Sequence, residues 1–160
     1  MNVAIQIFQF QTYNVFFSCT KKNIFMEGII TKIIYSDNII TTNDIFIITP
    51  FYSNKIDKNL SKCYLKFNAE NYMNVKTVNE LVKIEKKILD YYSNIHKSNK
   101  QPIYSLKNQL EKGYVKIHKE KKNENANEKK NSNYVVKISG IWENENHIGI
   151  VFKFFEIYVL

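Results

Sequence analysis

Arginine is absent from this sequence, and all 23 basic residues are lysines. The chain therefore cannot make the bidentate guanidinium contacts that recognise guanine or phosphate, and any phosphate contact would be the point charge of an ammonium group. The 15 acidic residues leave a net charge of +8 and an isoelectric point near 9.3. This charge favours an anionic partner, such as nucleic acid or a membrane surface. Because AT-rich coding also enriches lysine, ordinary solvated lysine faces are the alternative explanation.

Cysteine, glycine and proline are scarce, with 2, 4 and 2 residues in a chain of 160. Cys19 and Cys63 are far apart, with no CxxC motif and no histidine at ligand spacing. This spacing argues against a zinc site or a disulfide framework, and it favours an intracellular, reducing compartment. With so few glycines and prolines, tight turns must use asparagine, aspartate and serine.

Long apolar runs are also missing. No stretch reaches the roughly 18 apolar residues that a membrane-spanning helix needs. The N-terminal residues 1–18 are apolar but lack a basic n-region and are interrupted by polar residues, so they are not typical of a signal peptide. We therefore expect no membrane association.

The residues that are present indicate one folded domain over residues 1–160. Hydrophobic residues make up 44% and aromatic residues 14% of the chain, which is too apolar for a disordered protein. A chain of this length can bury roughly two-thirds of its unfolded surface.

Short β-prone runs, many of them alternating and most ended by Asn, Asp or Ser, predict strands. Gly28 is expected to form a bulge within one of them. Val3–Phe10 and Tyr13–Phe17 are predicted to be two strands or one bent strand. The other predicted strands are Ile24–Tyr35, Ile39–Thr42, Ile45–Thr49, Lys62–Phe67, Tyr114–His118, Tyr134–Trp142 and Ile148–Val159.

A change of period predicts one amphipathic helix over residues 77–95. Thr77 and Glu80 have the spacing of a capping box, and apolar residues follow at helical intervals with Glu85 as the only polar residue in the stripe. A second short helix is expected over residues 105–112. The polar segment 119–133 has no apolar periodicity and is predicted to be a flexible loop.

About eight strands, with one helix before the last three, predict a mostly β fold. The simplest match is an antiparallel Greek-key barrel like the oligonucleotide-binding fold, which places its helix between the third and fourth strands. A two-sheet sandwich with an added helix is the alternative.

Familiar catalytic motifs are missing. His96, His118 and His147 have no metal-ligand spacing, and the chain contains no glycine-rich phosphate loop and no GxSxG motif. Asp37 and Asp44 are a weak carboxylate pair, since aspartate in hairpins usually serves turn formation. We therefore predict a protein that is not an enzyme and has no cofactor and no metal.

Alternating lysines and aromatic residues are the best sign of a function. Such strand faces suit single-strand binding, where cations follow the phosphates and rings stack on bases. The alternative is the ordinary polar face of a half-exposed sheet. The predicted nucleic-acid-binding residues are Lys32, Tyr35, Lys62, Tyr64, Lys66, Tyr114, Lys116, His118, Lys137 and Lys153.

The C-terminal segments 137–143 (KISGIWE) and 149–154 (GIVFKF) resemble the closing hairpin of single-stranded-DNA-binding proteins of large DNA viruses. The Ile29–Ile48 hairpins, rich in Ile and Asn, are compatible with the same group, and with them the resemblance covers about a quarter of the chain. It implies an oligonucleotide-binding barrel that coats displaced strands during replication, without catalysis. Trp142 within it has a simpler alternative role in hairpin packing.

These patterns together predict a sequence-tolerant, single-stranded nucleic-acid-binding protein, with DNA favoured and a role in viral replication. A non-enzymatic structural or protein-interaction component, for example in viral assembly, is the alternative. Assembly into homo-oligomers is left open.

Overall fold

The structure is a computed structural model that describes residues 3–52, 54–59, 62–118 and 132–158. Its helices are α1 (Tyr72–His96) and α2 (Ser105–Leu110), with short 3-10 helices η1 (Ile7–Gln9) and η2 (Thr12–Asn14) near the N-terminus. The strands are β1 (Ile5–Gln6), β2 (Val15–Lys22), β3 (Ile29–Ser36), β4 (Thr41–Asn43), β5 (Ile45–Thr49), β6 (Asn54–Asn59), β7 (Lys62–Phe67), β8 (Gln101–Pro102), β9 (Tyr114–His118), β10 (Ser132–Glu143) and β11 (His147–Tyr158).

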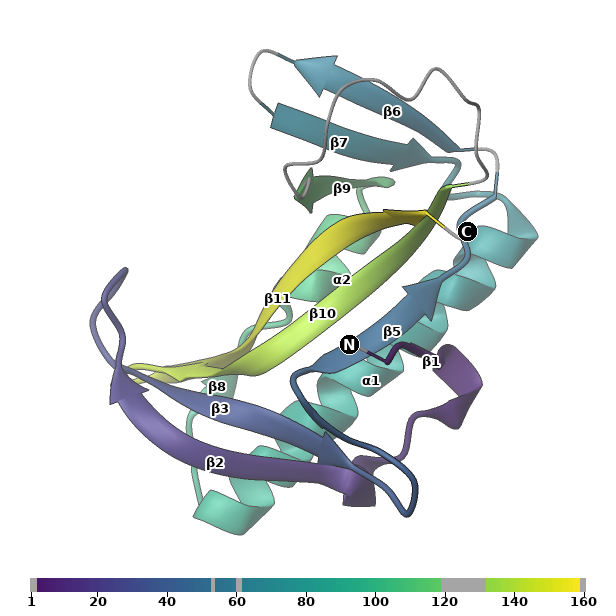
Figure 1. Cartoon of the computed structure of the whole chain (residues 1–160). Helices are drawn as coiled ribbons and strands as arrows, with labels where there is room; N and C mark the ends of the chain where they lie inside the picture. The colour runs from purple at the N-terminus through teal and green to yellow at the C-terminus, as the bar shows by residue number, and fades with distance from the viewer. Residues whose placement is uncertain (1–2, 53, 60–61, 119–131, 159–160) are drawn as a thin grey trace.

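All of these strands belong to one mixed sheet, which is organised around β10 (Figure 1). One edge of β10 pairs with β11 along nearly its whole length. The other edge pairs with β5 over residues 134–138 and with β3 over residues 140–143. The change of partner coincides with a bulge between Ile138 and Gly140. At Gly140 a Cβ atom would lie only 2.5 Å from the carbonyl oxygen of Thr31, so glycine allows the close approach of β3.

The predicted mostly β fold is confirmed, but the closed antiparallel barrel is not found. Strands are the main secondary structure of the described residues, and the sheet stays open. The pairs β1–β5, β8–β11 and β9–β11 are parallel, which an antiparallel Greek key does not contain. The described strands form a single hydrogen-bonded sheet, so the two-sheet sandwich is not found either.

Helix α1 covers one face of the sheet, on the side where α2 also lies (Figure 1). Its apolar stripe was predicted correctly and is buried, from Val78 through Leu81 and Ile88 to Tyr92. Its start was predicted wrongly. Asn71 is the N-cap and accepts hydrogen bonds from the backbone N–H groups of Met73 and Asn74. Thr77 lies inside the helix, where its hydroxyl donates to the carbonyl oxygen of Pro50 at 3.3 Å.

Several predicted strands are confirmed and others change. Strands β5, β7 and β9 have the predicted bounds, the hairpin of β10 and β11 is present, and α2 begins at the predicted residue. The predicted strand Val3–Phe10 is reduced to two residues followed by 3-10 turns, and β6 was not predicted. Of the predicted loop 119–133, residues 119–131 lie outside the described residues, and residues 132–133 begin β10.

The predicted strand Ile24–Tyr35 starts only at Ile29. Its first residues form a tight turn, and Gly28 closes that turn in place of forming a bulge within a strand. The ring of Trp142 in the β10–β11 hairpin packs against Gly149, where a Cβ atom would lie 2.5 Å from the indole. The hairpin-packing role considered for Trp142 therefore agrees with the structure.

Candidate nucleic-acid interface

The two lysine–aromatic stripes predicted on separate strands lie side by side. Strands β7 and β9 are antiparallel neighbours, with Tyr64 opposite Lys116 and Lys66 opposite Tyr114. The rings of Tyr64 and Tyr114 meet edge to face with their centroids 6.0 Å apart. Leu65, between the two lysines of β7, is fully buried on the helix side, so alternation turns the stripe to the opposite side of the sheet. We call that side the outer face.

The outer face continues across β11 and β10 to β3. His118 lies beside Phe155 of β11, and Lys153 of β11 is paired with Lys137 of β10. On β3, Lys32 lies opposite Gly140, and its neighbours in the strand, Thr31 and Ile33, are buried on the helix side. The sheet therefore brings nearly all the predicted residues together. This set, which we call the cationic face, consists of Lys32, Lys62, Tyr64, Lys66, Tyr114, Lys116, His118, Lys137 and Lys153.

Tyr35 is the predicted binding residue that the structure contradicts. It follows Thr31 and Ile33 on the helix side of β3 and is only 2% exposed. Its ring stacks with Phe10, and its hydroxyl accepts a hydrogen bond from the backbone N–H of Gln11 at 3.1 Å. The prediction considered the residue type but not the face of the strand on which the side chain lies. A buried ring cannot stack on a base.

Two of the predicted lysines are already paired with carboxylates. Lys66 forms an ion pair with Asp57 of β6 at 2.5 Å. Lys137 forms an ion pair with Asp44 at 2.9 Å, and its ammonium group lies 5.6 Å from the ring centroid of Phe46. Within the described part of the chain, no carboxylate forms an ion pair with the other lysines of the cationic face. These unpaired lysines are Lys32, Lys62, Lys116 and Lys153.

His118 lies at the centre of this face, between Lys116 and Lys153, and the pKa of its imidazole is lowered there. Partial burial lowers the pKa of its imidazole, and the charges of Lys153 and Lys116 lower it further. The imidazole is therefore neutral at physiological pH. A phosphate placed between these groups would meet two unpaired ammonium groups and a ring nitrogen.

The carboxylate pair considered from the sequence serves local structure. Asp37 accepts hydrogen bonds from the backbone N–H groups of Ile39 and Ile40, both at 2.8 Å, which lowers the pKa of its carboxyl group. Asp44 forms the ion pair with Lys137 already described. Asp37 therefore stabilises a turn, and Asp44 pairs with the charge of Lys137.

The outer face also carries residues that the prediction of the site did not include, among them Phe155 and Lys21. The ring of Phe155 lies 6.0 Å from the imidazole of His118 and adds an aromatic surface between β9 and β10. Lys21 of β2 lies opposite Ile30 and extends the row of lysines beyond Lys32. Phe155 could have been found from the alternation of the last strand, whereas Lys21 depends on the pairing of β2 with β3.

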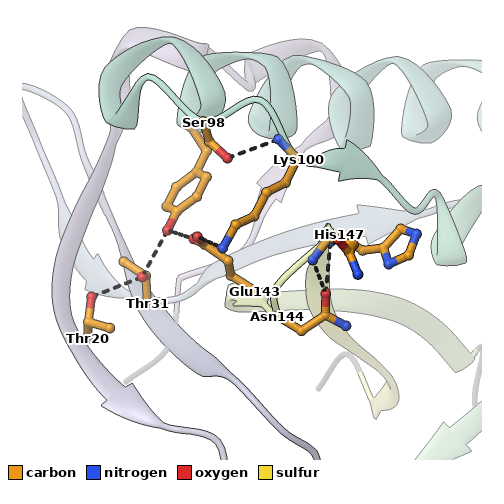
Figure 2. Close-up of polar contacts among 9 residues, drawn as sticks. Thr20, Thr31, Ser98, Lys100, Glu143, Asn144 and His147 are labelled. Atoms are coloured by element: carbon orange, nitrogen blue, oxygen red, sulfur yellow. Dashed lines mark hydrogen bonds and ion pairs between the residues drawn. The ribbon is translucent and has the colours of Figure 1, made fainter.

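A polar cleft of about 610 Å³ lies where the C-terminal end of α1 meets β2, β3 and the β10–β11 hairpin (Figure 2). The Tyr92 hydroxyl donates to a Glu143 carboxylate oxygen at 2.7 Å, and it lies 3.3 Å from the Thr31 hydroxyl. Because the single proton of Tyr92 is used on Glu143, Thr31 must donate to Tyr92. Thr20, 3.0 Å from Thr31, then donates to Thr31, and Lys100 forms an ion pair with Glu143.

The protonation states of this cluster follow from its surroundings. Burial raises the pKa of Tyr92 to about 12, and the hydrogen bond and charge of Glu143 add to this effect. Burial would raise the pKa of Glu143, but hydrogen bonds from Lys100 and Tyr92 and the charges of Lys100 and His96 lower it overall. At neutral pH a protonated tyrosine therefore donates to an ionised glutamate.

His96 lines the cleft beside Tyr92. Its Nδ1 lies 3.1 Å from the backbone carbonyl oxygen of Tyr92, so Nδ1 carries a proton, and the two rings stack with centroids 4.1 Å apart. Sequence reasoning missed this cluster, because its members come from four separate elements. Every buried side-chain polar atom in the described residues has a partner, and these residues contain no group of three His, Cys, Asp or Glu that could hold a metal ion. The cluster binds the end of α1 to the sheet.

Comparison with known proteins adds no assignment. No family model, curated protein or solved structure matches this chain. Among the described residues, none of the helices is long and apolar enough to cross a membrane.

Proposed function

We propose that the protein binds single-stranded nucleic acid, largely without regard to base sequence, on the cationic face. The observation that carries this proposal is the pairing of β7 with β9, which makes two stripes from distant parts of the chain into one surface of lysines and tyrosines. Lysines reach the phosphates, and the half-exposed rings offer stacking surfaces of the kind that single-strand binders use.

The absence of arginine suits this proposal. Lysine neutralises phosphates as a point charge and does not read base edges in the bidentate manner of arginine. The C-terminal resemblance favours DNA over RNA and a role in coating displaced strands during viral replication. The protein acts in this proposal as a binding protein without catalysis.

The second candidate is a structural or protein-interaction role. It is favoured by the apolar residues exposed at the N-terminal end of α1, where Tyr72, Met73 and Val75 face solvent near the exposed Tyr52. Contiguous exposed apolar side chains often mark a protein contact. Such a contact would not use the cationic face.

A fluorescence titration with a dT oligonucleotide at several salt concentrations tests the proposed function. The double variant Lys116→Gln/Lys153→Gln removes two unpaired lysines of the cationic face. The matched control, Lys76→Gln/Lys87→Gln, removes the same charge from exposed positions of α1. For single strands, the slope of log affinity against log salt concentration is about 0.7 per neutralised phosphate. We expect the first variant to lose about 1.4 from this slope and the control to keep the wild-type slope. Equal losses would show that only net charge matters.

The tyrosines are tested in the same titration. Replacing Tyr64 or Tyr114 with Ala should weaken dT binding by roughly 1–3 kcal/mol, the usual contribution of a base stacked on a ring. Tyr13, which is strongly exposed near the N-terminus, provides the matched control Tyr13→Ala. Unchanged binding together with a lowered melting temperature would assign the two rings to sheet packing.

A further inference from the structure

The turn between β2 and β3 exposes three consecutive large apolar side chains. Ile24 is 85% exposed, Phe25 is 88% exposed and Met26 is 48% exposed. We call these three residues the apolar tip. In Figure 1 the β2–β3 turn projects from the left edge of the molecule. Contiguous exposed apolar side chains of this kind mark a surface that a partner covers.

The turn that carries the apolar tip is held in place by its own backbone. The N–H of Asn23 donates to the carbonyl oxygen of Gly28 at 2.9 Å, and the buried Asn23 side chain accepts from the N–H of Phe25 at 3.0 Å. Gly28 has φ +120°, and a Cβ atom there would lie 2.0 Å from the carbonyl oxygen of Glu143. Gly28 therefore brings the turn directly against the end of β10.

The row of lysines on the outer face leads to the base of this turn. Lys32 and Lys21 lie on neighbouring strands on the outer face, and Lys22 is exposed at the end of β2. Glu27 is the one acidic residue within the turn. A strand that follows the cationic face across the sheet would thus reach the apolar tip.

We propose that the apolar tip is a wedge that packs on the last base pair where a single strand leaves a duplex. This inference rests on the proposed function, with the cationic face holding the displaced strand. The flat end of an open base stack is apolar, and side chains such as Phe, Ile and Met insert at base steps and partly unstack them. Lys21, on the outer face beside the turn, supplies the charge that meets the phosphates next to the junction.

The experiment compares a forked DNA that carries a dT tail and a 2-aminopurine base at the junction with the dT tail alone. The wild-type protein should bind the fork more tightly than the tail by roughly 5-fold or more, since stacking on one base contributes about 1 kcal/mol or more. Its binding should also raise 2-aminopurine fluorescence. The variant Ile24→Ser/Phe25→Ser should bind the tail normally, bind the fork no better than the tail, and leave the fluorescence unchanged.

The turn between β3 and β4 provides a matched control. Ile39 there is 91% exposed, and Ile39→Ser removes an equally exposed apolar side chain that the row of lysines does not reach. This control should behave as wild type in both measurements. Melting temperatures of all variants should agree, because the replaced side chains are exposed.

The outcomes separate this inference from the proposed function. Tail binding without any preference for the fork, or a preference that survives in the tip variant, would overturn the wedge and leave the proposed function standing. Absence of binding to the tail would overturn the proposed function itself. Binding to phosphatidylserine vesicles that is lost in the tip variant, without fork preference, would assign the apolar tip to a lipid surface and overturn the wedge.

Discussion

Glu85 is the one charged residue in the buried stripe of α1, and it caps a different helix. Its two carboxylate oxygens accept hydrogen bonds from the backbone N–H groups of Leu106 at 3.0 Å and Lys107 at 2.9 Å, in the first turn of α2. Burial raises the pKa of the carboxyl group, and the two hydrogen bonds partly oppose this effect. The helical period could predict that Glu85 faces inward. The segment that it contacts could not be predicted, because no local pattern encodes it.

Replacing Glu85 with Ala should lower the free energy of unfolding by roughly 2–3 kcal/mol, because two N–H groups would lose their acceptor in a buried site. Urea unfolding at pH 7 measures the change. Glu80→Ala is the control, since Glu80 lies on the same helix in a largely exposed pair with Lys83 and should cost about 0.5 kcal/mol or less. Equal losses for the two variants would contradict the capping role.

Glu143 makes the free energy of unfolding depend on pH. Its pKa is below the usual 4.5, so the native state favours the ionised form. The stability from this group is present above pH 4.5 and is lost as the pH falls through the native pKa. In urea unfolding between pH 6 and pH 3, the difference between wild type and Glu143→Gln should therefore shrink as the pH falls. Glu145→Gln, in the same cleft, is the control. A difference that is constant over this range would show that ionisation of Glu143 does not stabilise the fold.

At the scale of elements, α1 shows what a local pattern can and cannot predict. The apolar period identified the helix and its buried face, because burial of one stripe determines that period. The start was misplaced because the Thr77–Glu80 spacing fits a capping box equally well inside a helix. Asn71 provides the cap where the chain leaves β7, and the first helical turn shows mostly exposed residues, which carry no period.

Asn71→Ala should cost about 1 kcal/mol of unfolding free energy, the usual effect of losing an N-cap side chain. Thr77→Val tests the rejected assignment, since it keeps the shape of the side chain and removes only the 3.3 Å hydrogen bond to Pro50. We expect this second variant to be less destabilised than the first. Thermal unfolding followed by circular dichroism at 222 nm compares them, and the reverse order would restore Thr77 as the cap.

At the scale of the whole molecule, the sequence did not allow us to predict which strands pair with each other. Alternation predicted which residues of β7 and β9 share a face, but not that these strands are neighbours. The predicted barrel failed for a related reason, since strand count and helix position do not distinguish parallel from antiparallel partners. The candidate site was likewise predicted only in part. Its lysines and tyrosines were found by type, whereas Tyr35 was misplaced and the cleft around Glu143 was missed.

Strand β10 connects two parts of the sheet, one that contains β5 and one that contains β2, β3 and β4, which we call its two halves. Gly140 lies where the partner of β10 changes from β5 to β3. Gly140→Ala should lower the free energy of unfolding by roughly 1–3 kcal/mol, because the new methyl group would push β3 away from β10. Ser139→Ala, at the same bulge, should cost less. Urea curves followed by tryptophan fluorescence and by circular dichroism should coincide for both variants, as expected if the halves unfold together. Separate midpoints would show that β10 does not couple them.

The packing of Trp142 on Gly149 has a practical consequence. This indole is the only one in the chain, and it lies on the outer face opposite Ile30, close to the lysine row at Lys32 and Lys21. Selective excitation of tryptophan therefore reads out a single known position at the junction of the cationic face and the apolar tip. A ligand that binds there would alter the tryptophan emission of the unlabelled protein. Binding to the cationic face can therefore be followed without a dye.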